Sequence, residues 1–108
     1  MASLALALLV SCGNKKEAEK PEGLLSERQM IDVLTDAYLI ESELNYKRNS
    51  GENVVPLQKI YYDQMFEHYG ITDSIFEENM SYYSYHLVDL ERIMDSVTRR
   101  MEDAGRDR

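Results

Sequence analysis

The chain has 108 residues, which is enough for one small domain and too few for a large cleft between two domains. Twenty Asp and Glu residues outnumber twelve Lys and Arg residues, and the resulting net charge of −8 argues against nucleic-acid binding. The single cysteine excludes an intrachain disulfide and a cysteine-rich zinc site.

The chain begins with an apolar run, residues 1–11, which carries no charge and ends at Cys12. The run is too short to span a bilayer, which needs about 20 apolar residues. Leu9-Val10-Ser11-Cys12 is similar to the lipobox of bacterial lipoproteins, in which small residues admit a peptidase and the thiol receives a diacylglyceryl group. We therefore expect a signal peptide at 1–11, truncated at its start because no Lys or Arg precedes it, and lipidation of Cys12. The alternative is a buried helix start with an incidental thiol.

Residues 12–23 carry mixed charge, no aromatic or β-branched side chain, and Pro21 and Gly23 near their end. This composition cannot bury a core, so the segment is predicted to be the lipidated cysteine and a flexible tether. By resemblance to other lipoproteins, Gly13 instead of Asp after Cys12 favours the outer over the inner membrane. The expected location is the bacterial cell envelope, on either its periplasmic or its surface face.

From residue 24 onward the apolar residues recur with helical spacing. Ser26 and Gln29 form a capping-box pattern, so the first helix is predicted over about 27–47. Its expected core face comprises Met30, Leu34, Ala37, Glu41 and Leu44, supported by Ile31, Val33, Tyr38 and Ile40.

A second helix is predicted to begin near Pro56 and to end at Gly70, where a left-handed C-cap is expected. Its expected apolar face comprises Leu57, Ile60, Tyr61, Met65 and Tyr69. Thr72 is the predicted N-cap of the helix that follows.

The last segment carries a regular apolar seam with alternating spacings of four and three residues: Phe76, Met80, Tyr83, Leu87, Leu90, Met94, Val97 and Met101. One straight helix of about 30 residues satisfies this seam, and a kink near residues 84–86 is the competing interpretation. The predicted fold is all-α, a small antiparallel three- to four-helix bundle over residues 24–104 with a long C-terminal helix, either straight or kinked, and a charged tail at 105–108. Leu90→Ala is expected to cost about 2–5 kcal/mol.

Two stretches carry a family resemblance. Residues 61–72 begin with a tyrosine pair and end in His68-Tyr69-Gly70-Ile71-Thr72, and residues 81–86 hold a second tyrosine pair followed by His86. Together with residues 30–38, they resemble small bacterial envelope lipoproteins grouped as a domain of unknown function, DUF4296. The resemblance implies a fold but no substrate. Leu87 stands where the family usually has proline, so the covalent reason for a helix break is missing.

Few residues are candidates for chemistry. His68 and His86 lack further ligands at fixed spacing, so neither a metal nor another cofactor is expected. Asp36 and Glu41 lie on the first helix, and Glu41 is expected to reach the rim and pair with a tyrosine hydroxyl or Arg48. No nucleophile elbow or phosphate-binding loop is present, so we do not expect an enzyme.

The tyrosines are the most unusual feature. Between residues 60 and 91 there are seven carboxylates and no Lys or Arg, and six tyrosines fall within residues 61–85. The candidate partner-binding surface comprises Tyr62, Tyr82, Tyr85, Glu77 and Glu78. It suits a protein partner with basic residues, because exposed tyrosines are enriched at interfaces. The alternatives are a solvated acidic face with half-buried tyrosines, and a glycan site.

The expected function is therefore that of a lipid-anchored envelope binding module, with an accessory or chaperone-like role toward a protein partner. An envelope glycan-binding factor, or an enzyme that uses the acidic tyrosine surface, is the alternative function.

Overall fold

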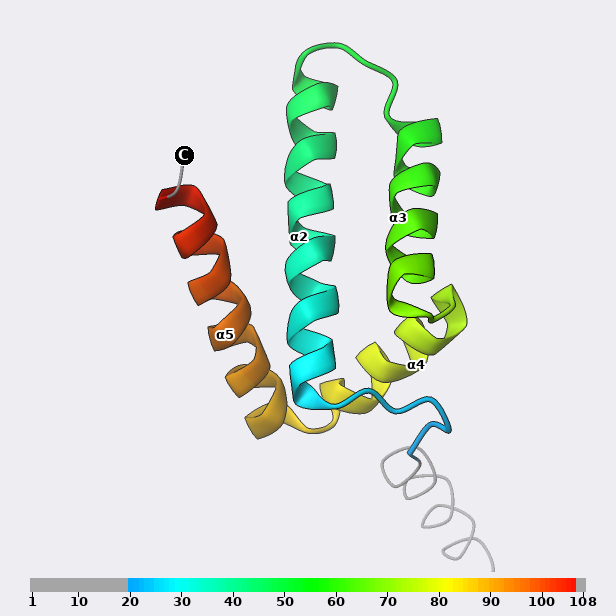
Figure 1. The fold of residues 1–108 in the computed structure, drawn as a ribbon, viewed down its shortest axis with the longest axis vertical. Coiled ribbons are helices and arrows are strands. Elements are labelled where there is room, and N and C mark those ends of the chain that lie inside the picture. The colour runs from blue at the N-terminus through cyan, green and yellow to red at the C-terminus, as the bar shows by residue number, and fades with distance from the viewer. Residues whose placement is uncertain (1–19, 107–108) are drawn as a thin grey trace, which may run out of the picture.

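The computed structural model describes residues 20–106, which form four helices (Figure 1). They are α2 (Glu27–Asn49), α3 (Val55–Tyr69), α4 (Asp73–Ser84) and α5 (Leu87–Arg106). α3 runs back alongside α2, α4 crosses below them, and α5 then rises on the other side of α2, parallel to it (Figure 1). The predicted all-α bundle is confirmed. The predicted signal peptide, Cys12 and most of the tether lie outside the described residues.

Local capping residues set the helix boundaries as predicted. Ser26 Oγ accepts a hydrogen bond from the Gln29 amide at 3.1 Å, and the Ser26 amide donates to Gln29 Oε1 at 2.9 Å, which completes the capping box. Gly70 ends α3 with φ of 66°, a conformation that glycine adopts without steric cost. Thr72 Oγ1 accepts from the Ile75 amide at 3.1 Å and so begins α4.

The helix breaks between α4 and α5, so of the two interpretations left open for the last segment the structure shows the kink near residues 84–86 and excludes one straight helix. The Tyr82 carbonyl accepts hydrogen bonds from the Tyr85 amide at 3.1 Å and from His86 Nδ1 at 2.8 Å. The His86 amide turns instead to the Tyr83 carbonyl at 3.0 Å. In an uninterrupted helix the His86 amide would donate a hydrogen bond to the Tyr82 carbonyl. Here the His86 imidazole donates to that carbonyl instead, and α4 ends without a proline.

The break also changes which residues of α5 face the core. Ile93, which the predicted seam omitted, is completely buried, and Val97 is buried beside it. Leu87, which the seam included, is 70% exposed. Leu90, Met94, Val97 and Met101 of the predicted seam still pack on the core, so the break removes Leu87 from the seam and leaves the later positions in place. α5 continues to Arg106, past the predicted domain boundary at residue 104.

The core is built around α2, which packs against both α3 and α5. Its members are Leu25, Met30, Val33, Leu34, Ala37, Met65, Tyr83, Ile93 and Val97. Leu44, predicted on the same face of α2, is also fully buried. Tyr38 and Ile60, which were expected on core faces, are exposed because their helices turn these positions away from the core cluster. Two ion pairs align α5 with α2: Arg92 Nε lies 2.8 Å from Glu27, and Arg100 pairs with Asp32.

A buried asparagine fixes the segment that precedes α2. Asn79 of α4 has no exposed surface, accepts a hydrogen bond from the Leu25 amide at 2.8 Å, and donates to the carbonyls of Gly23 and Ile75 at 2.9 Å each. The Tyr83 hydroxyl donates to the Leu25 carbonyl at 2.6 Å. Gly23, which the sequence placed at the end of the tether, is therefore bound to α4.

None of the helices among residues 20–106 combines the length and apolar character needed to cross a membrane.

Candidate functional site: an acid-rimmed groove between α2 and α3

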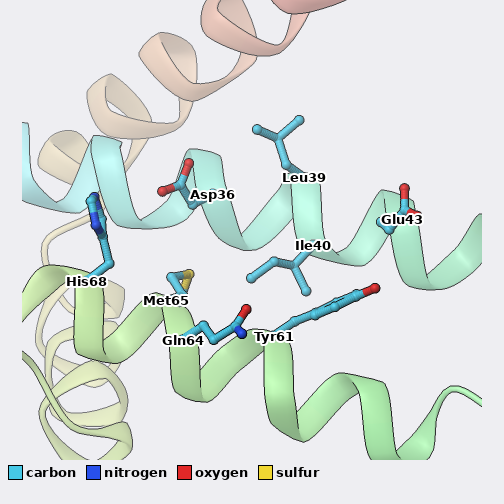
Figure 2. A pocket seen from close by; sticks show the side chains of 8 residues that line it. All are labelled: Asp36, Leu39, Ile40, Glu43, Tyr61, Gln64, Met65 and His68. Atoms are coloured by element: carbon cyan, nitrogen blue, oxygen red, sulfur yellow. The ribbon is translucent and has the colours of Figure 1, made fainter.

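A pocket of about 390 Å³ lies between α2 and α3. Each helix contributes four residues to it at spacings of three, one and three, so each quartet lies on one helix face. The lining residues are Asp36, Leu39, Ile40 and Glu43 from α2, and Tyr61, Gln64, Met65 and His68 from α3 (Figure 2). We call this feature the α2–α3 groove.

The floor of the α2–α3 groove is apolar. Ile40 and Met65 point into the space between the two helices, and Met65 is buried (Figure 2). Tyr61 extends along the groove toward the C-terminal end of α2, whereas Leu39 points away from α3 and is partly exposed (Figure 2). Such a floor can take up an apolar side chain, since binding sites are lined mainly by apolar groups with a few polar groups at the edge.

Two carboxylates stand at the rim of the groove. Asp36 accepts a hydrogen bond from the Tyr69 hydroxyl, which fixes its position. Glu43 lies 3.6 Å from Lys47 Nζ, and Lys47 also lies 3.9 Å from Glu52. The pKa of Lys47 is raised above its usual value, chiefly by the charge of Glu52. Because Glu52 shares this cation, Lys47 only partly offsets Glu43, and the rim keeps an acidic character.

Two tyrosine–carboxylate hydrogen bonds join α3 to α2. The Tyr62 hydroxyl donates to Glu41, as the Tyr69 hydroxyl does to Asp36. The expected pairing of Glu41 with a tyrosine hydroxyl is thereby confirmed. Burial, and then the facing carboxylate, raise the pKa of Tyr62 and of Tyr69 well above the usual value. These bonds hold the walls of the α2–α3 groove at a set separation.

The raised pKa values of buried tyrosines predict that the domain loses stability at alkaline pH. Burial is also the main cause of a raised pKa at Tyr83, so three of the eight tyrosines resist ionisation in the folded chain. When the pKa of a tyrosine is higher in the folded than in the unfolded chain, the neutral side chain stabilises the fold. This contribution is complete below the unfolded pKa of about 10 and is lost as the pH rises above it. We expect part of the tyrosinate absorbance to appear only with the loss of helical circular dichroism. Tyr62→Phe should shrink that delayed fraction, and full ionisation of a still-helical chain would contradict the interpretation.

The residues of the predicted partner-binding surface lie on two helices, α3 and α4. Tyr62 lies on α3, half-buried against Phe66, with its hydroxyl held by Glu41. Tyr82 stacks on His86 with ring centroids 4.1 Å apart. The others are exposed on α4 or at its C-cap: Glu77, Glu78 and Tyr85. Two of the three tyrosines therefore use their rings or hydroxyls within the domain.

The two histidines have different structural roles. His68 lines the α2–α3 groove (Figure 2). Its ring meets the Tyr69 ring edge-on, with the ring centroids 4.8 Å apart. His86 ends α4. Within residues 20–106, no three His, Cys, Asp or Glu side chains come close enough together to hold a metal ion.

Sequence reasoning singled out Asp36, Tyr61 and His68, but it did not place them in one groove. It gave no role to Leu39, Glu43 or Gln64. The available signal was the shared spacing of the two quartets, which identifies a face that adjoins the core face on α2 and overlaps it on α3.

The four helices and the α2–α3 groove define a small all-α domain in which two helices hold an acid-rimmed apolar groove. Residues 21–106 match the family described as "Domain of unknown function (DUF4296)", and the chain belongs to this family. The match includes the segment that Asn79 binds, and it confirms the resemblance to DUF4296. No curated protein and no solved structure matches the chain.

Proposed function

We propose that the chain is a lipid-anchored binding module of the bacterial cell envelope, which holds a protein partner in the α2–α3 groove and performs no catalysis. The lipobox pattern before Cys12 supports the anchor, and the pattern after Cys12 supports the outer membrane. The role is that of an accessory or chaperone-like subunit.

The α2–α3 groove carries the binding proposal. Its floor of Ile40 and Met65 suits an apolar side chain, and Asp36 and Glu43 at the rim suit an adjacent Lys or Arg. The net charge of −8 would attract a basic segment over longer distances. The preferred partner is thus a protein segment that places an apolar side chain next to a cation.

The groove is a better candidate than the surface predicted from the tyrosines. Tyr62 and Tyr82 make contacts inside the domain, whereas the groove is a pocket of about 390 Å³ with an apolar floor. Glu77 and Glu78 contribute to attraction rather than to contact area. An aliphatic and thioether floor also suits a protein side chain better than a glycan, so the glycan-binding alternative is less well supported.

Site-specific photocrosslinking in the intact envelope tests the proposal. A photoreactive residue at Gln64, inside the groove, should capture a partner, and one at Glu67, exposed on α3 outside the groove, should not. Leu39→Arg should reduce the captured species by about tenfold, or about 1.4 kcal/mol, because the new guanidinium can pair with Asp36 and Glu43 and would repel the cation of the partner. Ile60→Arg is the matched control, since Ile60 is similarly exposed and does not line the groove.

Two results would overturn parts of the proposal. Capture that is equal at Gln64 and Glu67, or insensitive to Leu39→Arg, would exclude the groove as the binding site. Mass spectrometry of the same preparation should show residues 1–11 removed and lipid on Cys12, and an unmodified thiol would exclude the anchor.

A further inference from the structure

The corner between α4 and α5 exposes three apolar side chains within four residues. Tyr85 is 51% exposed, Leu87 is 70% exposed and Val88 is 75% exposed. Single exposed apolar residues are normal on protein surfaces, but a cluster marks a contact site. We call these three residues the α4–α5 corner.

Their exposure follows from the helix break. Leu87 and Val88 lie in the first turn of α5, and the core-facing residues of α5 begin with Leu90 and Ile93. His86 folds back onto Tyr82 and covers neither of them. The corner therefore has no covering partner among the described residues.

The corner lies at the same end of the domain as the start of the described chain. Asn79 and Tyr83 bind residues 23–25 to α4, and this segment leaves the domain at the end that holds the corner (Figure 1). Cys12 precedes Lys20 by eight residues, which span at most about 29 Å. A lipid on Cys12 would thus keep this end of the domain within roughly 30 Å of the membrane.

We propose that the α4–α5 corner docks on the membrane surface, with Tyr85, Leu87 and Val88 entering the boundary between headgroups and acyl chains. The inference rests on the proposed lipid anchor. Tyrosine and aliphatic side chains suit this boundary, where one end of a side chain is wet and the other apolar. Three side chains bind weakly alone, but the tether raises their effective concentration at the surface.

The surrounding charges define the kind of lipid. Glu91 is exposed one helical turn after Leu87, and Asp89 pairs with Arg92 at 2.6 Å. With a net charge of −8, the domain is repelled by anionic headgroups. The corner therefore docks on zwitterionic lipid, and added anionic lipid weakens the docking at low salt.

The chain contains no tryptophan, so one introduced tryptophan reports on one position. The test compares Val88→Trp with Val55→Trp, because Val55 is 73% exposed and begins α3 at the opposite end of the domain (Figure 1). The mature chain from Cys12 onward is coupled through its single thiol to a maleimide-headgroup lipid in phosphatidylcholine vesicles with brominated acyl chains. Quenching by the brominated chains measures the depth of the tryptophan.

We expect Val88→Trp fluorescence to be quenched by about twofold or more and shifted to shorter wavelength, and Val55→Trp to be unaffected. Adding Leu87→Ser and Tyr85→Ser to Val88→Trp should reduce the quenching, and so should anionic phosphatidylglycerol in the vesicles.

Equal quenching at both positions, or none at residue 88, would overturn the docking. If residue 88 became protected only on addition of an envelope protein, the corner would be a protein contact and the proposal would also be wrong. Because the coupling is chemical, the result does not depend on whether the cell lipidates Cys12. Failure of the anchor and failure of the docking are therefore separate outcomes.

Discussion

Replacing Ile93 with alanine should lower the free energy of unfolding by about 2–5 kcal/mol. Ile93 has no exposed surface and lies where α5 packs on α2, so truncation leaves a cavity that the surrounding helices fill only in part. In so small a domain this is a large share of the total stability. The structure thus moves the largest expected effect from Leu90, which is only partly buried, to its neighbour three residues later.

Denaturant unfolding followed by circular dichroism measures this effect. Val88→Ala is the matched control, because it also truncates a β-branched side chain of α5 but at a 75% exposed position, and it should change stability little. A loss at Leu90→Ala as large as that at Ile93→Ala would contradict the register of α5 described above.

Asn79→Ala is expected to cost about 2–3 kcal/mol, although Asn79 is polar. Its side chain satisfies the Leu25 amide and the Gly23 carbonyl, and the variant would leave these groups without their partner. A buried polar group that loses its only partner costs about 1–3 kcal/mol. The variant should also release residues 23–25 from α4, since only the Tyr83–Leu25 hydrogen bond would remain of the bonds described there.

Hydrogen exchange at the Leu25 amide provides the local measurement. It should become faster in Asn79→Ala by much more than in Asn45→Ala, in which the replaced asparagine is exposed on α2. Tyr83→Phe removes the other bond to Leu25 and should have a smaller effect, of about 1 kcal/mol. Unchanged exchange at Leu25 in Asn79→Ala would show that the clamp does not hold this segment.

Much of the fold could be predicted because helix boundaries depend on nearby residues. Ser26 and Gln29 are three residues apart, Thr72 caps an amide three residues later, and Gly70 needs only its own conformational freedom. The core face of α2 followed from helical spacing, because a helix packed between two others buries a continuous stripe.

The candidate site could be predicted only in fragments. The polar side chains of Asp36, Tyr61 and His68 could be recognised as candidates one by one. The groove, however, forms only because α2 and α3 are rotated so that these two faces meet. The contacts of the tyrosines could not be predicted for a related reason. Tyr62 lies off the expected apolar face of α3, but Glu41 is 21 residues away in the chain and accepts its hydroxyl, which turns an apparently free ring into a structural contact.

The amino-acid pattern alone indicates four features: an acidic helical domain, its caps, the apolar face of α2 and an apolar run that ends at Cys12. These depend on composition or on residues within one helical turn. The break at His86, the burial of Ile93 and Asn79, and the α2–α3 groove depend on contacts between residues far apart in the chain. Asn79 and Leu25 are 54 positions apart, and the spacing of nearby residues does not predict which distant backbone group a polar side chain will contact.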